Sequence, residues 1–376
     1  MRAEFLLDPA VVFLNHGSFG ACPHPVFERY RAWQLELERQ PVEFLDRRLP
    51  GLLAEARTRL ARFVGTHPND LVFVPNATSG VNLAARALRL QPGDEVVSTD
   101  LEYGACDLVW QQLAGSTGAT YVRARVPLPL ERPEQVVDAI FAKVTERTRA
   151  VFVSHITSET ALALPVEDIV RRARRAGLTT VVDGAHAPAH VPLDLQALGA
   201  DYYAGNCHKW MCAPKGSGFL HVTPALQETV DALIVSWGFG DDTTFLSRNE
   251  RQGTRDPSAY LAVSAAIDWL EAHDLARLQE RGRALTRTGR RRLCELDGVQ
   301  PLAADSFLGQ MASVRVPTSD PDAVQRRLYL EHRIEVPVFP TSKVGPLLRL
   351  SVAPYTEESD LDALLEALPD LLRAAS

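Results

Sequence analysis

From about residue 50 to residue 250, short apolar runs rich in β-branched residues alternate with segments whose apolar residues recur at helical spacing. One such helical segment carries Val81, Ala84 and Leu88, and another carries Val137 and Ile140. This alternation is typical of a mostly parallel sheet with helices on both faces. The apolar runs predict strands at 71–74, 95–99, 150–154, 179–183, 202–204 and 218–222.

A second unit is expected after the Gly-rich and polar stretch 238–256. Asp256 and Pro257 are typical of a helix cap followed by proline at the first helical position, and they predict one long helix through Leu270. Further strands are expected at 311–316 and 347–352, before a closing helix that Thr356 caps. We therefore divide the chain into an N-terminal segment (1–45) that joins the small domain and the site entrance, a large domain (46–255) and a small α+β domain (256–376).

The composition is that of an ordinary globular protein, with 46% hydrophobic and 23% charged residues among 376. A net charge of −7 argues against a nucleic-acid partner, which normally needs a basic surface. The N-terminus lacks the basic-then-apolar pattern of a secretory signal, and no apolar run approaches the roughly 20 residues of a membrane span. We expect a cytoplasmic protein without a membrane partner.

The five cysteines are scattered and have no metal-site spacing. Cys207 and Cys212 are too far apart for a Cys-x-x-Cys pair. We expect reduced thiols and no bound metal.

A lysine and an upstream carboxylate form the most informative pair in the chain. Asp183 ends the apolar run 179–183, and Lys209 follows the next strand and its turn, between His208 and Trp210. Pyridoxal phosphate (PLP) needs an amine that bonds to its aldehyde and an anion that keeps its ring nitrogen protonated. Burial beside other cations would favour the neutral, nucleophilic amine. The pair therefore predicts a PLP site, although taken singly Asp183 could cap a turn and Lys209 could be solvated.

Two other strand ends carry groups that suit the same cofactor. Thr78 and Ser79 open a helix after strand 71–74, where N–H groups and a positive dipole end favour a phosphate. Tyr103 follows strand 95–99 and is able to stack on a planar ring. By themselves, the first pair is equally a helix cap and Tyr103 a core residue.

After strand 150–154 come His155, Thr157 and Ser158, which offer donors to a phenolate oxygen. His186, shortly after Asp183, is able to reach the ring or its substituents. A buried histidine bonded to backbone is the ordinary alternative for each imidazole. In open parallel sheets ligands bind at the carboxyl ends of the strands, so compatible groups at all of these ends together favour a cofactor site.

These residues resemble the class V aminotransferase family of fold-type I PLP enzymes, and most closely its isopenicillin N epimerase-like branch. The resemblance spans nearly the whole chain. It is carried by Leu14-Asn15-His16-Gly17-Ser18-Phe19-Gly20, Pro75-Asn76-Ala77-Thr78-Ser79-Gly80-Val81-Asn82, Ser154-His155-Ile156-Thr157-Ser158, Asp183-Gly184-Ala185-His186-Ala187-Pro188 and His208-Lys209-Trp210 with Pro214-Lys215-Gly216-Ser217-Gly218.

The resemblance implies the PLP-dependent transferase fold type I, with a mostly parallel, seven-stranded-type sheet in the large domain. It implies Lys209 as the Schiff-base lysine and Asp183 as the partner of the ring nitrogen. Tyr103 would cover one ring face, and His186 and Ser158 would lie near the phenolate oxygen.

The family pattern also implies which residues hold the phosphate. They are Ala77, Thr78, Ser79 and His208 within one chain, and Gly253-Thr254 from a neighbouring subunit. The resemblance therefore implies a homodimer with shared active sites.

Arg349, on the alternating segment 347–351, resembles the family's clamp for the substrate carboxylate, because a guanidinium grips a carboxylate with two parallel bonds. Asn15 and His16 would help to line the entrance. A small amino-acid substrate is implied.

Three reactions share these groups: epimerisation at Cα, carbon–sulfur β-elimination by a sulfoxide or cysteine-conjugate lyase, and transamination. An epimerase needs a second proton donor on the face away from Lys209, and Tyr103 is the candidate. Cysteine desulfurases carry a nucleophilic cysteine shortly before the clamp arginine, and residues 335–348 contain none. A non-catalytic binding module of the same fold would be expected to lack Lys209 or Asp183.

Overall fold

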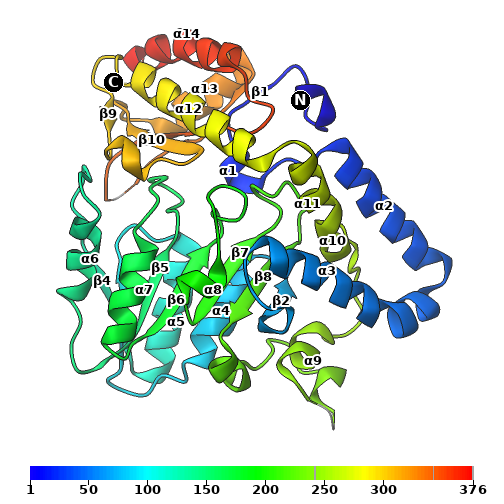
Figure 1. The fold of residues 1–376 in the computed structure, drawn as a ribbon. Coiled ribbons are helices and arrows are strands. Elements are labelled where there is room, and N and C mark those ends of the chain that lie inside the picture. Colours follow the sequence, from blue (N-terminus) through cyan, green and yellow to red (C-terminus); the bar gives the residue numbers. More distant parts are fainter. Residues whose placement is uncertain (241–242, 342, 375–376) are drawn as a thin grey trace.

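The computed structural model describes residues 1–240, 243–341 and 343–374. Two sheets lie one above the other, a large one flanked by helices and a small one near the C-terminus (Figure 1). The large sheet has the strand order β2-β8-β7-β6-β5-β3-β4. Its strands are β2 (Leu71–Val74), β3 (Glu95–Thr99), β4 (Thr120–Ala124), β5 (Thr148–Ser154), β6 (Thr179–Gly184), β7 (Tyr202–Asn206) and β8 (Gly218–Val222).

Six of these strands were predicted from the apolar runs, and the seventh, β4, was missed. Strand β8 runs antiparallel to both its neighbours, and the other pairs are parallel. Strand β4 is at the edge of the sheet and reads Thr-Tyr-Val-Arg-Ala, with only Ala124 buried. An edge strand that is largely solvated carries no continuous apolar run, which explains the omission.

Apolar cores cover both faces of the large sheet. Phe73 and Val151 belong to one core, whereas their neighbours Val72 and Phe152 belong to the other. Burial on both faces explains why these strands are continuous apolar runs. The helices after the strands are α4 (Ala77–Ala87), α5 (Gly104–Thr117), α6 (Glu134–Phe141), α7 (Val166–Arg175) and α8 (Leu195–Leu198).

The helix predicted from Pro257 through Leu270 is two helices, α10 (Ser258–Leu261) and α11 (Val263–Ala272), separated at Ala262. Asp256 bonds to the Ser258 N–H at 2.8 Å, as a cap would. Both helices contact α2 (His24–Arg39) and α3 (Leu49–Phe63), and α9 (Phe245–Glu250) lies nearby. No helix in the described ranges is long and apolar enough to cross a membrane.

The small sheet is antiparallel, with the order β12-β13-β10-β9. Thr356 does not cap the closing helix as predicted. Its hydroxyl accepts from the Ala353 N–H at 3.0 Å, and Asp360 accepts from the Glu357 N–H at 2.9 Å. The elements are β9 (Gln300–Pro301), β10 (Met311–Arg315), β12 (Val338–Phe339) and β13 (Leu347–Ser351), with α12 (Leu275–Leu293), α13 (Pro321–His332) and α14 (Glu358–Ala374).

The N-terminal segment ties this small unit to the large sheet. Strand β1 (Val12–Phe13) pairs in parallel with β11 (Ile334–Glu335), and the short helix α1 (His16–Phe19) follows at the junction (Figure 1). Gly20 then passes so close to the turn after β7 that a Cβ there would lie 2.0 Å from the carbonyl oxygen of His208, at a φ of +71°. Only glycine fits this approach. The domain boundaries at 45 and 255 stay predictions.

Candidate active site

A cavity of about 320 Å³ opens at the carboxyl ends of the large sheet's strands, where sequence reasoning expected a ligand. It brings together groups from six separate segments of the chain. Its walls include Ser18, Phe19, Asn76, Ala77, Thr78, Tyr103, Ser154, Ser158, Asp183, His186, Asn206, His208 and Lys209.

The backbone of Lys209 is fixed from two sides. Its carbonyl oxygen accepts from the Cys212 N–H at 2.9 Å and from Nε2 of His16 at 3.1 Å. Nδ1 of His16 then accepts from the Tyr355 hydroxyl at 2.9 Å. His16 is fully buried and burial lowers its pKa to about 3. His16 therefore holds the lysine turn from behind, and the structure does not bring it to the entrance where it was expected.

The amine of Lys209 faces an imidazole whose proton positions can be deduced. Trp210 Nε1 lies 3.3 Å from Nδ1 of His186, and an indole N–H only donates, so Nδ1 accepts. The neutral ring then carries its proton on Nε2, 3.1 Å from Nζ of Lys209. That proton needs a lone pair, so Lys209 is neutral in this arrangement. Burial and the charge on Arg349 lower the pKa of Lys209 to about 7, and burial also lowers the pKa of His186.

Asp183 is buried at the end of β6. Its Oδ1 accepts from the Ala185 N–H at 2.9 Å. Burial raises the pKa of Asp183, while that bond and the charge on Lys209 lower it. A buried carboxylate is stabilised by a cationic partner, which a protonated ring nitrogen would supply.

The start of α4 offers fewer free donors than the sequence suggested. The Ala77 N–H donates to Oδ1 of Asn206 at 2.8 Å, and the N–H and hydroxyl of Ser79 donate to Oδ1 of Asn76 at 2.9 and 3.1 Å. Ser79 is also outside the set of residues that line the cavity. Thr78 is the hydroxyl of this turn that faces the ligand space.

His208 lines the same end of the cavity. Its Nδ1 donates to the Ser217 carbonyl at 3.0 Å, so Nε2 is the ring nitrogen that is left for a ligand. Burial lowers the pKa of His208 to about 4. A nearby phosphate dianion would favour the protonated ring and so raise that pKa.

Arg349, on β13, is a buried cation bonded to neutral groups. Its Nη1 donates to the Ser158 carbonyl at 2.7 Å and its Nη2 to the Ser18 hydroxyl at 2.8 Å and to Oδ1 of Asn15 at 3.4 Å. Nε has no hydrogen-bond partner among the described residues. Burial lowers the pKa of Arg349 to about 10, with a nearby Glu159 opposing the shift. A buried guanidinium with an unused donor suits an incoming carboxylate.

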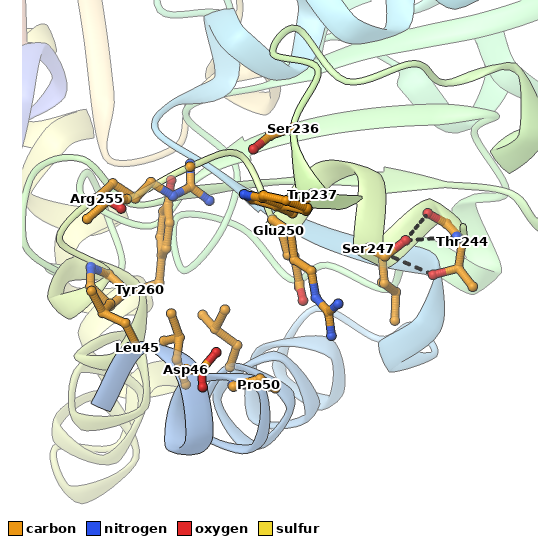
Figure 2. Close-up of a pocket in the computed structure, with 17 residues that line it drawn as sticks. Leu45, Asp46, Pro50, Ser236, Trp237, Thr244, Ser247, Glu250, Arg255 and Tyr260 are labelled. Atoms are coloured by element: carbon orange, nitrogen blue, oxygen red, sulfur yellow. Dashed lines mark hydrogen bonds between the residues drawn. The ribbon is translucent and has the colours of Figure 1, made fainter. Parts of the chain in front are cut away.

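Several predicted residues lie elsewhere. Nδ1 of His155 bonds to the Tyr203 hydroxyl at 2.8 Å and Thr157 bonds to Thr160 at 2.6 Å, so neither lines the cavity. Gly253 and Thr254 lie in a second cavity of about 730 Å³. Figure 2 shows this cavity, with Trp237 and Arg255 above and Asp46 and Pro50 below.

Sequence reasoning missed the supporting roles of Asn206, Trp210 and Ser18. Trp210 and Ser18 stand within quoted motifs and Asn206 lies just before one, but a motif gives no bonding partner. Trp210 was read only as an aromatic neighbour of Lys209, whereas its indole N–H fixes the tautomer of His186. Ser18 bonds to Arg349, which lies 331 positions further along the sequence.

The strand order and the strand-end site define the class of the protein: the fold is the PLP-dependent transferase fold type I, α/β with a mostly parallel central sheet. Two solved structures share it. The Escherichia coli cysteine desulfurase CsdA has a TM-score of 0.85 and 24% identity, covering 100% of this chain and 98% of that one. A C-DES variant with glycine covalently linked to its PLP cofactor has a TM-score of 0.87 and 23% identity, covering 98% and 99%.

The chain belongs to the aminotransferase class-V family, whose model matches residues 28–364. It is similar to the isopenicillin N epimerases of Amycolatopsis lactamdurans, 39% identical over 98% of this chain and 97% of the relative, and of Streptomyces clavuligerus, 38% identical over the same shares. It is also 26% identical to the probable chloroplastic L-cysteine desulfhydrase of Arabidopsis thaliana, over 97% of this chain and 84% of that protein. The resemblance drawn from the motifs is confirmed.

Proposed function

We propose that this protein is a PLP-dependent epimerase that acts at the α-carbon of an amino acid, of the isopenicillin N epimerase kind. Bound PLP supplies an aldehyde carbon that bonds to an amine and a ring that accepts electrons from Cα. The observation that carries the proposal is that a neutral lysine amine and a buried carboxylate line one cavity, and that the buried Arg349 bonds to Ser158 and Ser18 in the wall of that cavity.

The residues present fit this cofactor. Asp183 would pair with the ring nitrogen, and its burial without a bonded cation side chain agrees with that role. Thr78 and His208 would hold the phosphate, and the half-exposed Tyr103 would cover a ring face. Ala77 and Ser79 would contribute through the α4 dipole more than through their own N–H groups, which already have partners.

Substrate binding falls to Arg349. Its guanidinium would pair with the substrate carboxylate through the donors that now contact Ser158, Ser18 and Asn15. The pair would lie in a buried, water-poor environment, where a carboxylate–guanidinium bond is strong. Arg349 would thereby fix Cα next to Lys209.

Two side chains would move the Cα proton. Lys209 would remove it, because burial and the charge on Arg349 lower the pKa of its amine to about 7, so that the neutral form is available as a base. Tyr103 would return a proton from the other face, which inverts the centre. His186 would keep its proton on Nε2, which faces Lys209, because the indole N–H of Trp210 already bonds to Nδ1.

A β-eliminating lyase is the second candidate. It is supported by the similarity to the probable Arabidopsis L-cysteine desulfhydrase, at 26% identity, and to a second one, at 27%. The two epimerases, at 38–39% identity over nearly the whole chain, favour epimerisation. Transamination uses the same groups and has weaker support.

The test is to incubate the PLP-loaded enzyme in D₂O with isopenicillin N, D- and L-amino acids and cysteine conjugates. Deuterium incorporation at Cα with inversion, and without keto acid, supports the epimerase. Release of pyruvate and ammonia supports the lyase and refutes epimerisation as the main reaction. A Tyr103→Phe enzyme should still exchange the proton but invert more slowly.

We also propose a homodimer with shared active sites. Gly253 and Thr254 line a separate groove and not the strand-end cavity, which supports their placement at the phosphate site of a second copy. Five apolar side chains in and beside that groove are exposed, most of all Val235 at 76% and Trp237 at 89%; they are Leu233, Ile234, Val235, Trp237 and Phe239. Exposed apolar surface of this kind is typical of an interface. A second copy would cover it and receive Thr254 at its own phosphate.

A further inference from the structure

A cysteine contacts the carboxylate that we assign to the ring nitrogen. Sγ of Cys106, in the first turn of α5, lies 3.4 Å from Oδ2 of Asp183, and both side chains are buried. Burial, followed by the charge on Asp183, raises the pKa of the Cys106 thiol, which therefore stays protonated. The thiol donates to Oδ2, while Oδ1 accepts from the Ala185 N–H.

A second buried carboxylate stands near this contact. Oε1 of Glu102 accepts from the Thr99 hydroxyl at 2.6 Å, and Oε2 accepts from the N–H and hydroxyl of Ser154 at 2.8 and 2.5 Å. Ser154 is the β5 residue paired with Asp183 in the sheet. Burial, assisted by the charge on Asp183, raises the pKa of Glu102 to about 7. A charged Glu102 raises the proton affinity of Asp183 in return.

Asp183 is therefore under opposed influences. The Ala185 N–H and the Cys106 thiol stabilise its charged form, as does Lys209 when its amine is protonated. Burial acts against the charge. Tyr203, on β7, also faces Asp183, and its pKa is raised well above the usual value, so it contributes no charge.

We infer that Cys106 is a positioning residue: the hydrogen bond that its thiol donates fixes the orientation and charge of Asp183. Through Asp183, this hydrogen bond sets the electron-accepting strength of the cofactor ring. A thiol is a weak donor, so it orients the carboxylate without removing much of its charge. The inference rests on the proposed function only where it gives Asp183 to the ring nitrogen. The hydrogen bond between Cys106 and Asp183 forms without the cofactor.

The bond is tested in the apoprotein by infrared spectroscopy. The difference between the spectra of the wild type and of Cys106→Ala isolates the S–H stretching band of Cys106. We expect that band at a lower frequency than the band of Cys22, whose thiol faces a backbone carbonyl at 3.7 Å, because a carboxylate is the stronger acceptor. Asp183→Asn should move the Cys106 band upward. A band that Asp183→Asn leaves in place overturns the inference.

The effect on Asp183 is tested by titrating its carboxyl band with pH in the apoprotein. Loss of the donor in Cys106→Ala should raise the pKa of Asp183 by about one unit, whereas Cys106→Ser should restore or lower it. The visible spectrum of the PLP-loaded variants should change in the same order. Identical titrations of both variants and wild type, in chains with unchanged circular dichroism, would refute the inference. Cys22→Ala is the matched control.

A protein that fails to bind PLP would defeat the proposed function but would leave both apoprotein measurements interpretable. Conversely, normal epimerisation with an unperturbed S–H band would defeat only the inference about Cys106. The two failures are therefore distinguishable.

Discussion

The strand-end pocket and the groove at Gly253 and Thr254 differ in how far one chain completes them. In the pocket, the polar groups bond to one another: Trp210 to His186, His186 to Lys209, and Ser18 to Arg349. The groove is larger, at about 730 against 320 Å³, and a strongly exposed apolar segment ends beside it.

The pocket and the groove are therefore held in place in different ways. The register of buried strands fixes the residues that line the pocket, so a single chain supplies its lysine and its carboxylate. The groove combines loop residues and exposed apolar side chains, and we expect a second copy to complete it. Four experiments test whether the pocket and the groove differ in this way.

Lys209→Ala should have the largest effect, because it removes both the covalent anchor and the proton-transfer base. Turnover should fall by at least roughly 10³-fold, measured as Cα deuterium exchange, while PLP still binds weakly without covalent attachment. Lys215→Ala, an exposed lysine in the same loop, is the control and should keep wild-type turnover. Full activity of Lys209→Ala would remove the pocket from the chemistry altogether.

Arg349→Gln should raise KM by roughly 10²-fold or more, because loss of a buried charge pair costs about 3–5 kcal/mol. Arg349→Lys should recover part of this loss, since it keeps the charge but not the planar fork. A carboxylic acid that lacks the substrate amine should raise the melting temperature of the wild type but not of Arg349→Gln. An equal rise in both proteins would show that the carboxylate binds elsewhere.

The double change Val235→Asp with Trp237→Asp should disrupt the dimer contact at the groove without altering any residue of the strand-end pocket. We expect monomers by sedimentation, and PLP binding weaker by roughly tenfold, since one bond to a charged group is worth about 1.5 kcal/mol. Leu330→Asp, which alters an exposed leucine on α13 at 67% exposure, should leave both properties unchanged. If the wild type sediments as a monomer and still binds PLP with full affinity, the shared-site proposal is wrong.

Trp210→Phe should give the smallest effect and the most specific one. In the wild-type apoprotein the rate of covalent PLP capture should increase as pH rises through about 7, because the neutral amine of Lys209 is the reactive form. Without the indole donor, Nδ1 of His186 is free to carry the proton and Nε2 to accept one from a protonated Lys209. This stabilises the charged amine and shifts the midpoint to higher pH. Stopped-flow absorbance measures it, and an unshifted midpoint would rule out tautomer control by Trp210.

The sequence predicted the fold and the members of the pocket well where the signal was local. The six predicted strands are largely buried, so they appear as apolar runs, and strand ends collect at one edge of a parallel sheet. The edge strand β4 was missed because its residues are largely solvated. The cap at Thr356 was wrong because its hydroxyl bonds backward to Ala353.

The chemical groups could be read from the sequence: a lysine, a carboxylate, an arginine and a helix start. Their bonding partners follow from the folded structure. It gave His16 to the Lys209 carbonyl, Asn206 to the Ala77 N–H and Cys106 to Asp183. Hydrogen bonds depend on distances of a few tenths of an ångström between residues far apart in the chain, and periodicity and motifs carry no information at that scale.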